Sequence, residues 1–258
     1  MAMRVVVVGA GGRMGGEVCR LLTGQADIEL VGGVEAAGHR LVGSGLGKTE
    51  VVTDLARLID QTDIVVDFSS PAAVVANARV AAGAGKPFVS GVTGLIENQT
   101  AALCDCARRI PVVHAANFSL GVNVLCRLVA DAARLLGPGF DVEIVETHHR
   151  NKQDAPSGTA AQLVQTVKRS AGWHKTVYGR EGMVGAKPVD EIGVSSIRTG
   201  DVVGDHTVIF GGEGERLELT HRATSRLAFA YGVLAAIRFV KDRKPGFYSM
   251  DDVLAASS

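Results

Sequence analysis

Residues 4–15 read Arg4-Val5-Val6-Val7-Val8-Gly9-Ala10-Gly11-Gly12-Arg13-Met14-Gly15, and this stretch decides the fold of the chain. A continuous apolar run that ends in glycine is typical of a strand buried on both faces of a parallel sheet. Val18, Leu21 and Leu22 then recur at helical spacing, so the glycines form a tight turn between strand and helix. A pyrophosphate can approach the backbone N–H groups of such a turn, where the helix dipole favours anions. The stretch therefore predicts a dinucleotide site.

This glycine cluster departs from the strict spacing of the dinucleotide motif. Met14 stands where the third glycine belongs, and Gly15 serves instead. Glu35 strengthens the prediction because it closes the next expected strand, Ile28 to Val34, where a carboxylate accepts hydrogen bonds from ribose hydroxyls. A glycine-rich turn that is needed only for packing is the alternative.

Two later loops follow expected strand ends. Gly91-Val92-Thr93-Gly94 comes after one strand, and Ala116-Asn117-Phe118 comes after another. Ligands bind at the carboxyl ends of the strands in parallel sheets, so both loops are candidates for contact with the nicotinamide half of a cofactor. Each is equally compatible with an ordinary turn.

Strand and helix patterns alternate up to about residue 118. This alternation predicts an α/β fold with a doubly wound parallel sheet that is covered by helices on both faces. The expected strands are Arg4–Val8, Ile28–Val34, Ile64–Phe68, Pro87–Ser90 and Ile110–His114. Three helices are expected between them: one over residues 53–60, one that begins at Ser70-Pro71, and one over residues 100–109.

The pattern changes after residue 118 and predicts an α+β region with an antiparallel or mixed sheet. Ala171 to Asp190 is rich in glycine and proline and is expected to be a long loop. The expected helices are Val122–Leu136, Gly158–Ser170 and Leu227–Val240, and the expected strands are Asp141–Thr147, Ile192–Arg198, His206–Phe210 and Glu215–Thr220.

The stretch from Glu146 to Thr159 carries a second cluster of chemical groups. His148, His149 and Lys152 leave a strand together, and Ser157-Gly158-Thr159 opens a helix. The N–H groups of a helix start bind a carboxylate, and nearby cations bind a second anionic group. His148 and Lys152 are each able to supply a proton. A histidine metal pair, which lacks a third ligand at useful spacing, and a solvated basic loop are the alternatives.

Composition narrows the class of protein. The chain has 258 residues, with 27 Lys and Arg against 27 Asp and Glu, so it lacks the basic footprint of a nucleic-acid-binding protein. It has no apolar run of the roughly 20 residues that a membrane helix needs. Its four cysteines show no metal-ligand spacing. We therefore expect a cytoplasmic protein without metal, membrane or nucleic-acid partners.

With these motifs the chain resembles the 4-hydroxy-tetrahydrodipicolinate reductase (dihydrodipicolinate reductase) family over nearly its whole length. The most specific motif is E-x-H-H-R-x-K-x-D-A-P-S-G-T at Glu146 to Thr159. The others are G-A-G-G-R-M-G at 9–15, D-F-S at 67–69, G-V-T-G at 91–94, A-N-F-S at 116–119, G-D-x-x-G-x-H at 200–206 and A-x-S-R-x-x-F-A at 223–230.

The resemblance implies that NAD(P)H delivers hydride to C4 of a cyclic imine dicarboxylate, with loss of water, to give tetrahydrodipicolinate in lysine and diaminopimelate biosynthesis. It implies that His148 is the acid–base residue and Lys152 the proton donor. His149, Ser157, Gly158 and Thr159 are the implied substrate contacts. The implied cofactor contacts are Gly9, Ala10, Gly11, Gly12, Arg13, Met14, Glu35, Gly91, Val92, Thr93, Ala115, Ala116, Asn117 and Phe118.

Two positions depart from the family pattern. Many members have arginine after the acid of the second strand, where it meets the 2′-phosphate of NADPH, but here Ala36 follows Glu35. NADH is therefore favoured over NADPH, although Arg13, His39 or Arg40 is near enough in sequence to serve a phosphate. Val92 stands where threonine is common, which a backbone contact would tolerate.

The resemblance also implies a Rossmann-like nucleotide domain, residues 1–118 plus 226–258, with an inserted α+β domain, residues 119–225, for substrate binding and oligomerisation. A homotetramer joined through the sheets of the inserted domain is expected, with the loop from Ala171 to Asp190 at the interface. Two other functions stay open at this point: a dehydrogenase of the same plan that acts on an amino-acid semialdehyde, and a non-catalytic NAD(H) sensor.

Overall fold

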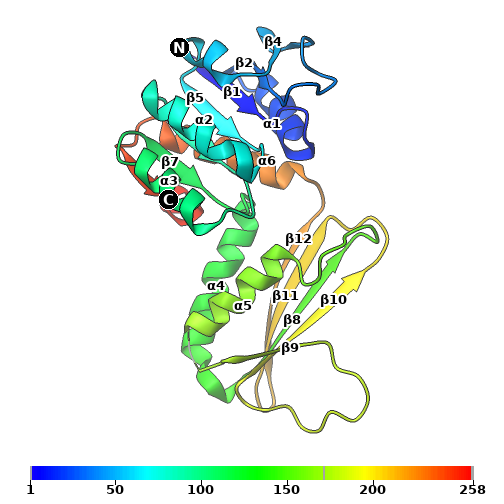
Figure 1. Ribbon diagram of the computed structural model, residues 1–258. Helices are drawn as coiled ribbons and strands as arrows, with labels where there is room; N and C mark the ends of the chain where they lie inside the picture. Colours follow the sequence, from blue (N-terminus) through cyan, green and yellow to red (C-terminus); the bar gives the residue numbers. More distant parts are fainter. Residues whose placement is uncertain (1, 171, 257–258) are drawn as a thin grey trace. The chain divides into compact units, whose positions relative to one another are not determined.

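The computed structural model describes residues 2–170 and 172–256 (Figure 1). Contacts divide the chain into two compact units, which we call unit 1 (Met1–Leu120 with Arg226–Ser258) and unit 2 (Gly121–Ser225). None of the helices within the described residues combines the length and the apolarity that crossing a membrane requires.

A largely parallel sheet forms the centre of unit 1. Its strands lie in the order β13-β7-β6-β5-β1-β2-β4-β3, and β3 pairs antiparallel with β4 at the edge. The strands are β1 (Met3–Val8), β2 (Ile28–Val34), β3 (Gly45–Leu46), β4 (Thr49–Val52), β5 (Ile64–Asp67), β6 (Phe88–Ser90), β7 (Pro111–His114) and β13 (Gly246–Tyr248).

Helices cover both faces of this sheet. Val5 and Val7 of β1 pack on one face with α1 (Arg13–Thr23), α6 (Leu227–Val240) and α7 (Met250–Ala255). Val6 and Val8 pack on the other face with α2 (Pro71–Gly83) and α3 (Glu97–Cys106). The continuous valine run is explained by this burial on both sides, because alternate side chains of a strand point to opposite faces. The prediction of a doubly wound α/β fold is confirmed.

Unit 2 contains a mixed sheet. Its central strand, β8 (Asp141–His148), pairs parallel with β10 (Glu191–Arg198) and antiparallel with β11 (Gly204–Gly211), while β12 (Arg216–Ala223) and β9 (Lys175–Tyr178) form the edges. The helices α4 (Leu120–Leu136) and α5 (Gly158–Ser170) supply apolar side chains that pack on one face of the sheet (Figure 1). The predicted α+β character is therefore confirmed.

Local details differ from the sequence expectations. The helix expected over 53–60 is wrong: the segment forms two short 3₁₀ turns, Leu55–Arg57 and Ile59–Gln61, because its backbone bonds close over three residues and Leu58, at φ −112° and ψ −10°, interrupts a continuous helix. Asp54 does cap the first turn, since its carboxylate accepts from the N–H of Ala56 at 2.9 Å.

The long loop expected from Ala171 to Asp190 is wrong in part, because β9 lies within it and pairs parallel with β10. Ala171 itself lies outside the described residues. Four residues are too few to show a strand period in the sequence, and the strand forms because the edge of β10 offers backbone partners. The strands β3, β4 and β13 and the helix α7 are also short, with two to six residues each, and were not expected.

Candidate functional site

The glycine turn after β1 is built by close backbone approach. Gly9 has a φ of +76°, and a Cβ there would lie 2.6 Å from the carbonyl oxygen of Phe68. A Cβ at Gly15 would overlap the carbonyl oxygen of Gly9, so Gly15 provides the tight helix–turn packing of the motif's third glycine. Only glycine fits both positions, and the turn leaves room above the N-terminus of α1.

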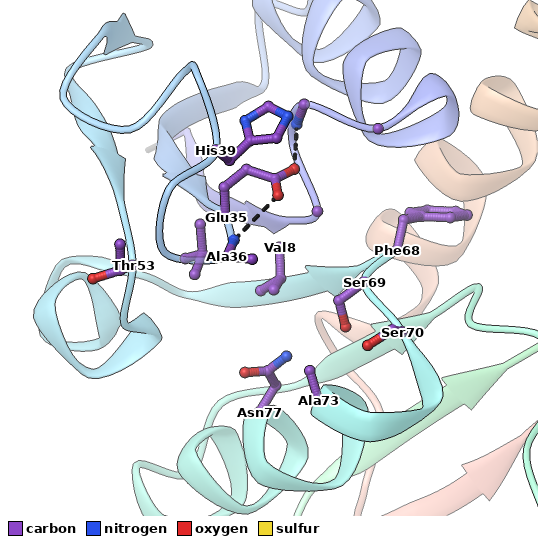
Figure 2. A pocket seen from close by; sticks show the side chains of 14 residues that line it. Val8, Glu35, Ala36, His39, Thr53, Phe68, Ser69, Ser70, Ala73 and Asn77 are labelled. Carbon is purple, nitrogen blue, oxygen red and sulfur yellow. Dashed lines mark hydrogen bonds between the residues drawn. The ribbon is translucent and has the colours of Figure 1, made fainter.

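A cavity of about 430 Å³ lies beside this turn at the carboxyl ends of the strands of unit 1 (Figure 2). Glu35 forms part of its wall. One carboxylate oxygen accepts from the N–H of Gly11 at 2.7 Å, and the other accepts from the N–H of Ala36 at 3.2 Å. The ring of His39 packs directly against Gly11, where a Cβ would enter the ring. A carboxylate beside a glycine turn is the arrangement that holds a ribose next to a pyrophosphate.

The same cavity contains residues that the sequence did not place there: Phe68, Ser69, Ser70, Thr53, Ala73 and Asn77. Buried Asp67 organises this wall, since it accepts from the N–H of Ser69 and from the Asn77 amide, both at 2.8 Å. Burial raises the pKa of Asp67, although these hydrogen bonds oppose the effect. The motif D-F-S-S-P at the end of a strand was the available signal, but it was used only to place a helix start and to support the family resemblance, not to predict cofactor contacts.

A second cavity of unit 1, of about 310 Å³, gathers the loops that were expected to contact nicotinamide. Its wall includes Met14, Gly91, Thr93 and the segment 116–118, together with the unpredicted Phe68 and Phe229. Four expected contacts line neither of these cavities: Ala10, Arg13, Val92 and Ala115. Ala10 and Val92 are buried in the apolar core, so their side chains serve packing.

In unit 2, Glu146 and His148 lie on the same face of β8, two residues apart. Both are buried, and the His148 Nδ1 atom lies 2.5 Å from a carboxylate oxygen of Glu146. Arg198 of β10 donates to both oxygens of Glu146 at 2.8 Å, and the N–H of Ser157 donates to one of them at 3.1 Å. Burial alone would raise the pKa of Glu146, but the hydrogen bonds from Arg198 and His148 outweigh it and lower that pKa to about 2.

His148 and Lys152 lie in different environments. Burial lowers the pKa of His148, with Lys152 and Arg198 adding to the effect and Glu146 opposing it, so the imidazole is neutral at pH 7. Lys152 follows β8 in the loop before α5, and its Nζ lies 2.9 Å from a carboxylate oxygen of Asp154. Its side chain is 20% exposed, so the ammonium group lies at the boundary with solvent.

The start of α5 is joined to the same cluster. The Ser157 hydroxyl accepts from the N–H of Ala160 at 3.1 Å, as a helix cap does, and lies 2.9 Å from Nε2 of His206. The His206 ring contacts the ring of His148 edge-on, with centroids 5.2 Å apart. The polar groups of Ser157 thus point into the buried cluster, while Gly158 is exposed and Thr159 is half-buried.

The buried His206 predicts a pH-dependent stability. Burial and the neighbouring His148 lower the pKa of His206 from 6.5 to about 4, so between these values the unfolded chain binds more protons than the folded one. Its contribution to stability is complete above pH 6.5 and is lost as the pH falls towards 4. Urea unfolding should show that wild type loses about 2 kcal/mol more between pH 7 and 5 than His206→Gln does. Equal losses in the two proteins would contradict the assignment.

Two family models match the chain. The model for the N-terminus of dihydrodipicolinate reductase matches residues 3–118, and the model for its C-terminus matches residues 121–254. A relative from Myxococcus xanthus, named 4-hydroxy-tetrahydrodipicolinate reductase, is 46% identical and covers 98% of this chain and 97% of its own length. A relative of the same name from Syntrophobacter fumaroxidans is 43% identical, with 98% of each chain covered.

Solved structures are also similar. A dipicolinate-bound dihydrodipicolinate reductase from Paenisporosarcina sp. TG-14 gives a TM-score of 0.82 at 26% identity, over 96% of this chain and 98% of that one. GenD2 from gentamicin A biosynthesis, in complex with NAD, gives a TM-score of 0.60 at 17% identity, over 98% and 90% of the two chains, and shows similarity of fold alone.

Proposed function

Since this chain belongs to the dihydrodipicolinate reductase family and is an NAD(P)H-dependent reductase of 4-hydroxy-tetrahydrodipicolinate in lysine and diaminopimelate biosynthesis, we propose which of its residues perform the reaction. His148 is the acid–base residue, and Lys152 is the proton donor. The observation that carries this assignment is the position of His148 at the end of β8 and of Lys152 in the short loop that leads from β8 to α5.

Unit 1 fits a dinucleotide. The glycine turn packs so closely on neighbouring backbone that a Cβ at Gly9 or Gly15 would overlap it, and the Glu35 carboxylate stands beside the turn where a ribose would bind. A bound nicotinamide nucleotide supplies the hydride. The residues that we propose to contact the cofactor are residues 9–14, Glu35, Gly91, Val92, Thr93 and residues 115–118. Where a side chain is buried, as in Ala10 and Val92, the backbone makes the contact.

Unit 2 binds the dicarboxylate substrate. The backbone N–H groups of Gly158 and Thr159 in the first turn of α5 attract one carboxylate, and the side chains of His149 and Lys152 add positive or hydrogen-bonding groups. Ser157 supports this site by capping the helix. The dipicolinate found in the Paenisporosarcina structure, a planar pyridine dicarboxylate, supports a ligand of this chemical class.

The net reaction consumes one proton for each hydride, because hydroxylated substrate, reduced nicotinamide and a proton give the reduced ring, oxidised nicotinamide and water. The Lys152 ammonium gives the proton, and it stands at the solvent boundary from which it is reprotonated. His148, neutral at pH 7 because of its lowered pKa, accepts and returns a proton during loss of the hydroxyl group.

A coupled assay tests the activity. A dihydrodipicolinate synthase makes the substrate in the cuvette from pyruvate and aspartate semialdehyde, and the absorbance of reduced nicotinamide is followed. We expect rapid oxidation that needs both precursors and the synthase. Oxidation with aspartate semialdehyde alone would indicate a semialdehyde dehydrogenase. Folded protein that binds NADH but never oxidises it would indicate a sensor.

For the cofactor we expect dual use with NADH preferred, because Ala36 lines the cavity where a 2′-phosphate would need a cation. The values of kcat/KM for the two cofactors measure this preference. Ala36→Arg should raise kcat/KM for NADPH roughly 10-fold, since a charge-assisted hydrogen bond contributes about 1.5–3 kcal/mol. Ala101→Arg, on the exposed side of α3, is the matched control. A wild-type kcat/KM clearly higher with NADPH would overturn the proposal.

We also expect a homotetramer that assembles through the unit 2 sheet. The helices α4 and α5 pack on one face of this sheet, and Val145, Ile197 and Ile209 point to its other face. Ile197 is 45% exposed there. Light scattering at micromolar concentration should give the mass of four chains, and Ile197→Asp should lower it because a buried carboxylate is costly. A wild-type monomer would contradict the prediction.

A further inference from the structure

We propose that Glu146 and Arg198 are positioning residues for His148: they hold the imidazole with Nδ1 as the hydrogen-bond donor, so that Nε2 is the atom that exchanges a proton with the substrate. This inference rests on the proposed role of His148. It adds the tautomer of the His148 ring, the ring nitrogen that exchanges the proton, and the two residues that determine both. All the groups involved belong to unit 2.

The hydrogen bonds of Glu146 fix the direction of its contact with His148. Its two oxygens receive both donor groups of Arg198 and the N–H of Ser157, and the pKa of Glu146 is held at about 2. A carboxylate that is ionised at all working pH values is only an acceptor. The Nδ1 atom of His148 must therefore carry the hydrogen, and the neutral imidazole has its lone pair on Nε2.

The side of the ring that carries Nε2 is left open by a glycine. A Cβ built on Gly204 of β11 would lie 2.9 Å from Nε2 of His148. The backbone of Gly204 does not have the positive φ that glycine alone favours, so the missing side chain is explained by space next to Nε2 rather than by backbone strain. Alanine at this position would place a methyl group against the atom that we assign to proton exchange, and the His148 ring or the strand would have to shift to make room for it.

The charges around His148 balance each other. Glu146 lies beside Nδ1, Arg198 of β10 neutralises Glu146, Lys152 is the cation of the following loop, and His206 of β11 contacts the ring from its edge. Glu146 favours the imidazolium form, whereas burial, Lys152 and Arg198 favour the neutral form. Arg198 thus orients Glu146 and also prevents its charge from keeping His148 protonated near pH 7.

These opposing effects predict opposite shifts in the pH profile of kcat. Glu146→Gln removes the group that favours the imidazolium, so the limb of the profile that reports His148 should move to lower pH. Arg198→Gln removes a cation and should move that limb to higher pH. Both variants should lower kcat at least roughly 10- to 100-fold, the effect of removing the hydrogen-bond partner that orients a metal-bound histidine. The KM values for substrate and NADH should change little.

The controls separate positioning from general damage. Glu143→Gln changes an ion-paired glutamate on the same strand but on the opposite face of the sheet. This variant should have the kcat of wild type and the same pH dependence of kcat. Glu146→Asp should recover part of the lost kcat of Glu146→Gln. Gly204→Ala should lower kcat, and its thermal unfolding is measured beside it because the new methyl group overlaps the His148 ring.

Nitrogen-15 NMR of histidine in the wild-type protein tests the tautomer without any substitution. His148, assigned by its absence in His148→Gln, should show a protonated Nδ1 and an unprotonated Nε2 at neutral pH. The opposite tautomer, or wild-type kcat and pH limbs in folded Glu146→Gln, would overturn the inference. If His148→Gln keeps the kcat of wild type, then the proposed acid–base role of His148 is wrong, and this result is distinct from a failure of the positioning inference alone.

Discussion

We expect His148→Gln to lower kcat at least 100-fold, because a positioned acid–base group contributes roughly 10²- to 10⁴-fold and glutamine cannot exchange the proton. NADH should bind with a dissociation constant within about twofold of wild type, since an interaction confined to the chemical step changes kcat rather than affinity. Both cavities proposed for the cofactor are lined by residues of unit 1, whereas His148 and its hydrogen-bond partner Glu146 belong to unit 2. Steady-state kinetics and a fluorescence titration of NADH measure the two quantities.

The matched control for this variant is His174→Gln, which changes an exposed histidine of the same unit and should leave kcat unaltered. Thermal unfolding must accompany both variants, because His148 is buried and its ring contacts His206. A folded His148→Gln protein with near-normal kcat would show that the acid–base assignment is wrong. A loss confined to NADH affinity would instead indicate that His148 contributes to cofactor binding.

The fold was predictable where the sequence pattern is long and the burial is extreme. The valines of β1 are apolar at every position because both faces of the sheet are covered, and the glycine turn follows directly. Helices as long as α4 and α5 show their period within their own residues. Elements such as β3, β9 and the 3₁₀ turns after Asp54 are too short for a period, so they depend on neighbours that only the tertiary structure provides.

In unit 2 the candidate site was predictable only where its residues are close in the sequence. His148, Lys152 and the start of α5 share one short segment, and a reader of the sequence finds them together. Arg198 and His206 reach the same cluster from β10 and β11, and no local pattern connects them with His148. Similarly, Asn77 reaches Asp67 from the second turn of α2 because the helix packs on the sheet.

Lys152→Ala should also lower kcat roughly 100-fold, and it should raise the KM for the dicarboxylate as well. The first effect follows from loss of the proposed proton donor, and the second from loss of a cation near an anionic ligand. Because the ammonium lies beside Asp154 at 2.9 Å, removal of the side chain also frees that carboxylate to repel the substrate. Kinetics at several substrate concentrations separate the two effects.

Two companion variants decide between these explanations. Asp154→Asn removes the anion but keeps the ammonium, so the double variant Lys152→Ala with Asp154→Asn should recover KM without recovering kcat. Lys168→Ala, in the last turn of α5, controls for the loss of a lysine elsewhere in unit 2. Recovery of kcat in the double variant would mean that Lys152 acts only by neutralising Asp154. In that case the proton must come from His148 or from water, and Lys152 would be a substrate-binding residue.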